Sequence, residues 1–121
     1  MDESFAADLR QAWRHRLEQK KRVEDQRRQL AVERASAAAS VLRAKYGAKK
    51  VFLYGSLAWG PSFDERSDID LMVEGLPDQA GYWRMLAEVG DVVRPFEISV
   101  VRQEDAFESL RKKVQETGVL L

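Results

Sequence analysis

Residues 51 to 56, Val-Phe-Leu-Tyr-Gly-Ser, and residues 67 to 73, Ser-Asp-Ile-Asp-Leu-Met-Val, decide the fold of this chain. The first stretch is a short apolar run with the length of a buried strand, and it stops at Gly55, which allows a tight turn. No helix breaker follows until Gly60, so we expect Ser56 to begin a short helix. The Ser56 hydroxyl and the free N–H groups at that helix start would favour a phosphate.

The second stretch alternates charged and apolar residues. Because side chains on a strand point alternately to its two faces, Asp68 and Asp70 are predicted to share one face, while Ile69 and Leu71 point into a core. Two carboxylates side by side repel each other, and a bound divalent cation removes that cost. Mg²⁺ prefers hard oxygen ligands of this kind. The pattern therefore predicts a magnesium site beside the phosphate-binding turn.

Together, Gly55-Ser56 and Ser67-Asp68-Ile69-Asp70-Leu71 resemble the signature of the polymerase-β-like nucleotidyltransferases, most closely the minimal nucleotidyltransferases. The resemblance covers roughly residues 30 to 121 and includes the ending Gly118-Val119-Leu120-Leu121. It implies an α/β fold with a small mixed β-sheet flanked by helices, here carrying a long N-terminal helical extension. The competing interpretation is a solvated acidic strand end beside an ordinary turn.

In this family a third carboxylate stands on a strand beside the aspartate pair, and the resemblance assigns that position to Glu97. The run from Phe96 to Val101 again alternates, as a strand would. The family more commonly has aspartate there, so three roles stay open for Glu97: a direct metal ligand, a ligand through water, or an exposed strand residue. The resemblance implies that nucleotide is bound by Gly55, Ser56 and Ser67, and that two Mg²⁺ ions are held, and catalysis performed, by Asp68, Asp70 and Glu97.

The same resemblance implies ATP as donor and transfer of AMP with loss of pyrophosphate. Minimal nucleotidyltransferases are typically antitoxins, so the implied partner is a toxin of the HEPN (higher-eukaryote-and-prokaryote nucleotide-binding) type, neutralised by adenylylation. One alternative is an antitoxin that acts by binding alone, since Leu57 stands where many members have arginine. Another is a small-molecule nucleotidyltransferase whose missing substrate domain a homo-oligomer would supply.

Composition fits one compact domain of 121 residues with 45% hydrophobic residues. The formal net charge is zero, so no global attraction to nucleic acid is expected and direct nucleic-acid binding is disfavoured. The chain has no cysteine, which excludes disulfides and thiolate metal sites. No apolar run approaches the length of a membrane span. These features favour a soluble cytoplasmic protein.

The N-terminal third contains no glycine or proline from Asp2 to Tyr46 and is predicted to be helical, as one helix or as a hairpin. We divide the chain into an extension, 1–29, and a nucleotidyltransferase domain, 30–121, whose first helix packs on the sheet. Between Arg14 and Arg28 seven basic residues stand against three acidic ones. This excess of four favours either an RNA or acidic partner, or a solvated helix with i,i+4 ion pairs.

Four large apolar residues, spaced by four, form a stripe along the extension: Phe5, Leu9, Trp13 and Leu17. Such a stripe usually folds back on its own domain, and the alternative is that it binds another chain.

Two further helices are predicted after the aspartate strand. The first runs over residues 79–89, is capped by Asp78 and ends at Gly90, with Trp83 in the core or at its rim and a brief strand at residues 92–93. The second covers residues 103–117 and ends at Gly118. Its predicted buried residues are Phe107, Leu110 and Val114.

Overall fold

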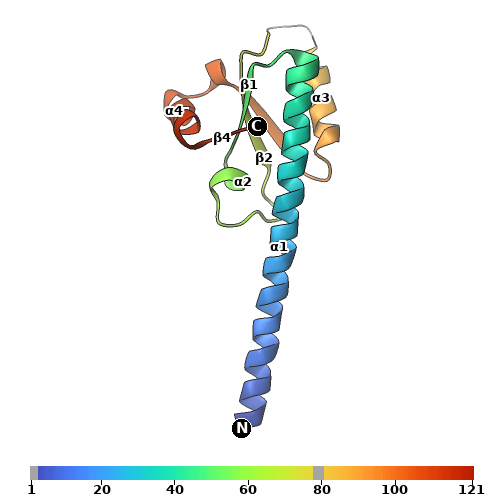
Figure 1. The fold of residues 1–121 in the computed structure, drawn as a ribbon, viewed down its shortest axis with the longest axis vertical. Helices are drawn as coiled ribbons and strands as arrows, with labels where there is room; N and C mark the ends of the chain where they lie inside the picture. Colours follow the sequence, from blue (N-terminus) through green and yellow to red (C-terminus); the bar gives the residue numbers. More distant parts are fainter. Residues whose placement is uncertain (1–2, 78–80) are drawn as a thin grey trace.

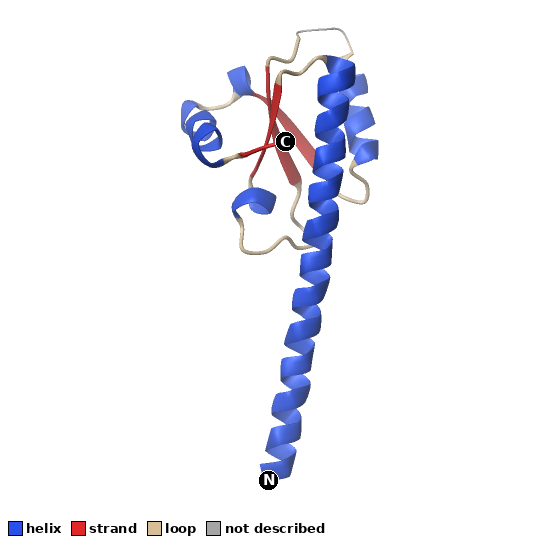
Figure 2. Ribbon diagram, in the orientation of Figure 1, coloured by secondary structure: helices blue, strands red, loops and turns tan. Residues whose placement is uncertain are grey.

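The computed structural model describes residues 3–77 and 81–121 and has an α/β fold, which confirms the predicted fold class. Figures 1 and 2 show a long N-terminal helix against a small sheet with further helices. The elements in order are α1 (Glu3–Tyr46), β1 (Lys50–Tyr54), α2 (Ser56–Trp59), β2 (Ile69–Glu74), α3 (Tyr82–Val92), β3 (Ile98–Arg102), a 3₁₀ turn (Gln103–Asp105), α4 (Glu108–Thr117) and β4 (Val119–Leu120).

The sheet is mixed and has the strand order β3-β2-β1-β4. β1 pairs antiparallel with both β2 and β4, while β2 and β3 are parallel and are connected through α3. The register pairs Asp70 with Tyr54 on one side and with Ser99 on the other. Since directly paired residues point to the same face, these three side chains share one face of the sheet.

One face of the sheet is covered by α1 and α3, which lie side by side (Figure 1). α1 presents small residues to it, and Ala31, Ala35 and Ala38 are fully buried. Their spacing of four and three keeps them on one side of the helix, and their small size lets the helix backbone lie close to the sheet. They pack in one core with buried residues of the strands, α3 and the loops, including Val51, Leu53, Ile69, Leu71, Val73, Met85, Val89, Phe63 and Phe96.

α4 lies on the opposite side of the sheet (Figure 1). There Met72 of β2 and Val114 of α4 are almost completely buried, although neither belongs to the main core. Asp70 points to the same face as Met72, two residues earlier, and is only partly buried. The covered part of this face therefore ends next to the aspartates.

The extension and the first helix of the domain form a single 44-residue helix, so the hairpin alternative is wrong. The helix is continuous across residues 29 and 30, where we divided the chain. Its N-terminal half projects away from the domain (Figure 1), and every residue from 3 to 23 is exposed except the half-buried Ala6. No helix in the described ranges has the length and apolar character needed to cross a membrane.

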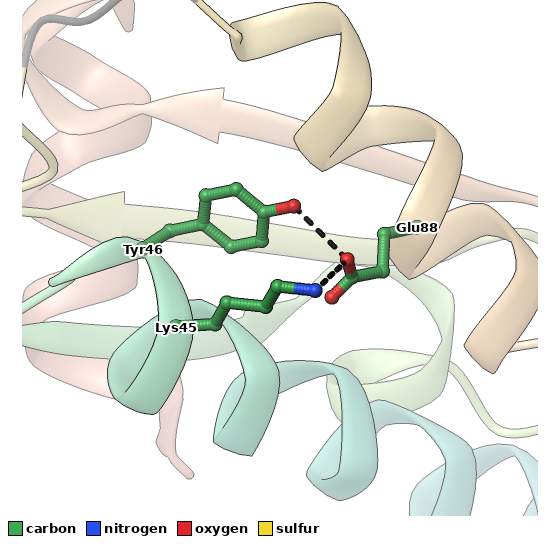
Figure 3. A network of polar contacts seen from close by, with 3 residues as sticks. All are labelled: Lys45, Tyr46 and Glu88. Atoms are coloured by element: carbon green, nitrogen blue, oxygen red, sulfur yellow. Dashed lines mark hydrogen bonds and ion pairs between the residues drawn. The ribbon is translucent and has the colours of Figure 1, made fainter.

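A polar network fastens the C-terminal end of α1 to α3 (Figure 3). The Lys45 ammonium group donates to Glu88 Oε1 at 2.6 Å, and the Tyr46 hydroxyl donates to the same oxygen at 3.1 Å. The hydrogen bond from Lys45 and then the one from Tyr46 hold the pKa of Glu88 below its usual value against the opposing effect of burial. The network adds a polar link between α1 and α3 to their apolar packing.

The predicted limits of the third helix were wrong. α3 continues through Gly90 to Val92, so Gly90 does not end it and residues 92–93 form no strand. A glycine inside a helix costs only about 1 kcal/mol relative to alanine, which the burial of Val89 and Val93 offsets. The predicted cap at Asp78 lies outside the described residues. Trp83 is 80% exposed, and so the prediction that it belongs to the core or rim was wrong.

The last helix, α4, is shorter than the helix predicted for residues 103–117. A 3₁₀ turn precedes α4, and Phe107, just before the helix, is 85% exposed and does not join a buried stripe. Val114 is buried as predicted. Gly118 ends the helix as predicted, donating its N–H to the Val114 carbonyl at 2.7 Å.

Candidate active site

The two aspartates come to lie on one face of the sheet at the start of β2. Ile69, between them in sequence, is fully buried in the main core, and the alternation of the strand places Asp68 and Asp70 on the opposite face. Asp70 is half-buried and Asp68 is exposed. The structure thus brings the two carboxylates to a common face, as the sequence pattern predicts.

The carboxylate of Asp70 is in an unfavourable environment for a negative charge. Its pKa is raised first by burial and second by the charge of Asp68, so the two carboxylates are close enough to repel each other. Across the pair of strands, the pKa of Tyr54 is raised by burial and by the charge of Asp70. A positive charge placed at this face would relieve both carboxylates.

The turn at Gly55 is packed directly against Asp70. Gly55 has φ +74°, a conformation that side chains rarely adopt, and a Cβ atom built on it would overlap Oδ2 of Asp70. Only glycine therefore allows the carboxylate to reach this turn. The contact joins the two stretches of sequence from which the site was predicted.

Ser56 begins α2, as predicted, and is exposed. The helix is a single turn in which the N–H groups of Ala58 and Trp59 donate to the Gly55 carbonyl, at 3.1 and 2.8 Å. No side chain caps its first turn within the described part of the chain. Ser56 is therefore accessible beside the turn that contacts Asp70.

Ser67 has a different environment from the other predicted nucleotide-binding residues. Its hydroxyl donates to Asp64 Oδ1 at 3.2 Å and accepts the N–H of Asp64, also at 3.2 Å. The N–H of Arg66 and the Ser67 hydroxyl hold the pKa of Asp64 below its usual value. These bonds close the loop that leads into Asp68, and in this arrangement Ser67 orders the loop.

Glu97 lies one residue before β3 and is exposed. Its backbone carbonyl accepts the N–H of Ile69 at 2.9 Å, so the parallel register continues and places Glu97 next to Asp68 on the adjacent strand. However, over residues 3–77 and 81–121 no three carboxylate or imidazole side chains are grouped so as to hold a metal ion. A metal-binding role for Glu97 stays a prediction.

The donor set itself fits Mg²⁺ in its chemistry. Asp68 and Asp70 offer hard oxygen ligands on one face, and the raised pKa of Asp70 reflects a repulsion that a bound cation would offset. One or two carboxylates, completed by phosphate oxygens and water, are a usual ligand set for Mg²⁺ in proteins. The predicted second ion would depend on Glu97.

Two residues near the turn have positions that the sequence did not predict. Leu57 is only 4% exposed, so the side chain at this position points into the core and away from the aspartates. Arg28, on α1, donates to the carbonyl of Leu57 at 2.8 Å and to the carbonyl of Gly60 at 2.9 Å. The arginine thereby holds the short helix α2 against α1, across a sequence separation that no local pattern reveals.

A third unpredicted contact lies on the other side of α2. Trp59 donates its indole N–H to the Thr117 carbonyl at 3.1 Å, and the Lys113 ammonium group lies 4.2 Å from the centre of its ring. The ring of Tyr54 is 5.9 Å from that of Trp59. α2 is thus held between α1 and α4, which keeps the Gly55 turn in place above Asp70.

A groove of about 610 Å³ lies away from the aspartates, between the projecting part of α1 and the loop that follows α2. It is lined by Arg16, Gln19, Lys20, Val23, Glu24, Arg27, Asp64, Glu65 and Arg66. Neither Asp68 nor Asp70 contributes to it, so we place the candidate site on the sheet face, where the two carboxylates interact.

No protein-family model matches this sequence, and a search of curated proteins gives no significant match. The fold and the geometry of the Asp68–Asp70 face therefore carry the functional argument.

Proposed function

We propose that the chain is a Mg²⁺-dependent nucleotidyltransferase that acts as an antitoxin, transferring AMP from ATP to a HEPN-type partner toxin. The observation that carries the proposal is the contact between the Asp70 carboxylate and the Gly55 turn, with Asp68 on the same face. If the Gly55 turn binds phosphate and the aspartates bind Mg²⁺, this contact would bring both groups within reach of one triphosphate. If the aspartates were only a solvated strand end beside an unrelated turn, no close contact between Asp70 and Gly55 would be expected.

In this proposal Asp68 and Asp70 hold Mg²⁺, and Gly55 and Ser56 bind the β- and γ-phosphates through backbone N–H groups and the Ser56 hydroxyl. The bound ion would neutralise phosphate charge and lower the pKa of the attacking hydroxyl. Asp70, fixed by its packing on Gly55, sets the position of the α-phosphate relative to the acceptor.

The reaction is an in-line displacement at the α-phosphorus of ATP. The acceptor oxygen forms a bond to phosphorus, the bond to the bridging oxygen breaks, and pyrophosphate leaves with the electron pair. The acceptor hydroxyl loses its proton to a nearby carboxylate. Glu97 is our candidate for this proton acceptor, because it is exposed and lies one strand away from Asp68.

We propose a protein acceptor because minimal nucleotidyltransferases, which this sequence resembles in Gly55-Ser56 and in residues 67–71, are paired with a partner toxin. A helical toxin with an accessible tyrosine hydroxyl would present its acceptor to the exposed side of Asp68. Dependence on ATP and Mg²⁺, together with the absence of cysteine from the sequence, fits action in the cytoplasm.

The direct test is the intact mass of the protein encoded beside this one after incubation with the chain, ATP and Mg²⁺. We expect one or more added AMP units with the wild-type chain and none with Asp70→Asn. Asp91→Asn, which neutralises an exposed acid of α3, is the matched control and is expected to act like wild type. An unmodified partner under conditions that bind ATP would contradict the proposal.

A second candidate function is neutralisation by binding alone. Two observations favour it: Glu97 does not join the aspartates in a three-carboxylate group, and the residue after Ser56 is a buried leucine that offers no positive charge to a triphosphate. A growth-rescue assay with Asp68→Asn and Asp70→Asn combined separates the two functions. Full protection by this variant would favour masking, and loss of protection would favour transfer.

A further inference from the structure

The projecting half of α1 carries a row of large apolar side chains that its own domain does not cover. Phe5, Leu9, Trp13 and Leu17 are 54%, 59%, 61% and 53% exposed. Their spacing of four keeps them on one side of the helix. Most of the stability of a helix in a protein comes from tertiary packing of its apolar face, so a surface that packs on this row would stabilise the projecting segment.

The row continues the core-facing side of α1 beyond the edge of the domain. Trp13 and Leu17 precede the fully buried Ala31 and Ala35 by 18 residues, which is about five helical turns. Both pairs therefore lie on the same side of the helix. One end of α1 lies against the sheet and the other end projects from the domain (Figure 1). The apolar side of α1 is therefore buried at one end and exposed at the other.

The row is symmetric about Gln11. In an antiparallel pair of such helices centred on this residue, Phe5 of one copy lies opposite Leu17 of the other, and Leu9 lies opposite Trp13. A surface that is complementary to itself in this way is what a twofold interface requires, because each residue contact then occurs twice.

The charges on the two sides of Gln11 are complementary. Residues 2–10 contain three acids and one arginine, a net of two negative charges, whereas residues 12–20 contain three bases and one acid, a net of two positive charges. Antiparallel pairing about Gln11 brings the acidic segment of each copy against the basic segment of the other. Parallel pairing would bring like charges together, which is unfavourable.

From this double symmetry we infer that two copies of the chain associate through the projecting part of α1, antiparallel and centred on Gln11. In that arrangement residue 3 of one copy lies opposite residue 19 of the other. The two domains stand at opposite ends of the helix pair. The inference is independent of the proposed enzymatic activity.

The first test is the mass in solution of the full chain by analytical ultracentrifugation over a concentration series. We expect wild type to have twice the monomer mass of 13.9 kDa and Leu9→Glu with Trp13→Glu to have the monomer mass. The control, Gln11→Glu with His15→Glu, adds two acids on the opposite side of the same turns and is expected to remain a dimer. A wild-type monomer throughout, or equal dimerisation of the stripe variant, would overturn the inference.

The second test measures orientation, and the absence of native cysteines makes it specific. Phe5→Cys and Leu17→Cys are expected to form a mixed disulfide when combined under oxidising conditions, and neither is expected to cross-link with itself. Two copies of residue 5 would be about 18 Å apart along the antiparallel pair, too far for a disulfide. Self-cross-linking of each variant would show parallel pairing and overturn the inference. A wild-type monomer that binds an unrelated protein through the stripe would overturn it as well.

Discussion

At the residue scale, the candidate site depends on one close contact, between the Asp70 carboxylate and the Cα of Gly55. Sequence alone predicts the components, because alternation places Asp68 and Asp70 on one face and a glycine after a strand predicts a turn. That the turn touches this carboxylate follows from the antiparallel register, which pairs Tyr54 with Asp70. Register between strands is a tertiary property and cannot be obtained from either stretch separately.

Replacing Gly55 by alanine is expected to destabilise the fold by about 1 to 3 kcal/mol, because the backbone at positive φ and the overlap with Asp70 both penalise a Cβ atom. Urea denaturation measures the change. Gly90→Ala is the matched control: it lies inside α3, with nothing within 4 Å of the added Cβ, and should gain about 0.5 to 1 kcal/mol. Equal effects of the two substitutions would contradict this description of the turn.

Replacing Asp70 by asparagine is expected to increase stability at neutral pH. Because its folded-state pKa is raised above 3.8, Asp70 destabilises the folded state once both states are ionised, and this cost disappears below pH 3.8. The difference between Asp70→Asn and wild type should therefore shrink as the pH falls towards 3.8. Thermal unfolding of both proteins from pH 7 to pH 4 measures this difference in stability. A difference that stays constant over this range would show that it does not arise from the burial of the Asp70 carboxylate and the charge of Asp68.

The side-chain environments of Ser67 and Glu97 mark the limit of sequence reasoning at this scale. A motif assigns a residue to a position along the chain, whereas the hydrogen bonds of Ser67 to Asp64 depend on how a particular loop closes. Likewise, the register places the backbone of Glu97 beside Asp68, but its side chain remains solvated. Whether Glu97 approaches a bound ion is decided by the ion and its ligands.

At the scale of elements, α2 is the part of the site with the least structure of its own. A single helical turn is too short to be stable in isolation, and its position depends on Arg28 from α1 and on the Trp59 contacts with α4. The sequence predicts that a short helix starts at Ser56, and this is confirmed. It did not reveal Arg28, which belongs to a run of basic residues that otherwise suits a solvated helix.

Arg28→Met keeps the aliphatic stem and removes both hydrogen bonds to α2, so a loss of about 1 to 3 kcal/mol in the free energy of unfolding is expected. If α2 positions phosphate, the same variant should bind Mg·ATP more weakly than wild type. The control is Arg22→Met, on an exposed part of the same helix. Indistinguishable stabilities of the two variants would mean that the bonds from Arg28 do not hold α2.

The network between α1 and α3 gives a second prediction at this scale, and it is a pH dependence (Figure 3). Because the pKa of Glu88 is lowered in the folded state, its charge stabilises the fold above pH 4.5. This stabilisation is lost as the pH falls through the folded-state pKa. The pKa of Lys45 is raised, mainly by its hydrogen bond to Glu88, so the contribution is also lost at pH values above 10.5. Glu88→Gln should therefore be less stable than wild type at pH 7, with little difference at pH 3, as measured by urea midpoints. A difference that grows at pH 3 would rule out this linkage.

Element limits were predicted less well than element types, for physical reasons visible at Gly90 and Phe107. Gly90 was expected to stop a helix, but burial of the helix on both sides of it outweighs its low propensity. Phe107 was expected in the core because of its spacing from Val114, yet α4 begins only after it and leaves its ring in solvent. In both cases tertiary packing, and not the local sequence preference, determines where the helix begins or ends.

At the scale of the whole molecule, the fold consists of a small α/β domain and a helix that extends far beyond it (Figure 1). The sequence predicts both parts, but the expectation that the apolar stripe folds back on its own domain was wrong. α1 is continuous and contains no glycine or proline at which the chain could reverse. The stripe is exposed in the single chain, and a second copy is the occupant that its symmetric spacing and charges favour.

The central claim is that the Asp68–Asp70 face binds a nucleoside triphosphate with Mg²⁺. The most direct measurement is calorimetric titration of ATP into the wild-type chain and into Asp70→Asn, with and without Mg²⁺, with Asp91→Asn as control. We expect wild type and Asp91→Asn to bind ATP only when Mg²⁺ is present, and Asp70→Asn to bind at least about tenfold more weakly, which corresponds to 1.4 kcal/mol. Absence of binding to wild type, or equal binding by Asp70→Asn, would contradict the claim.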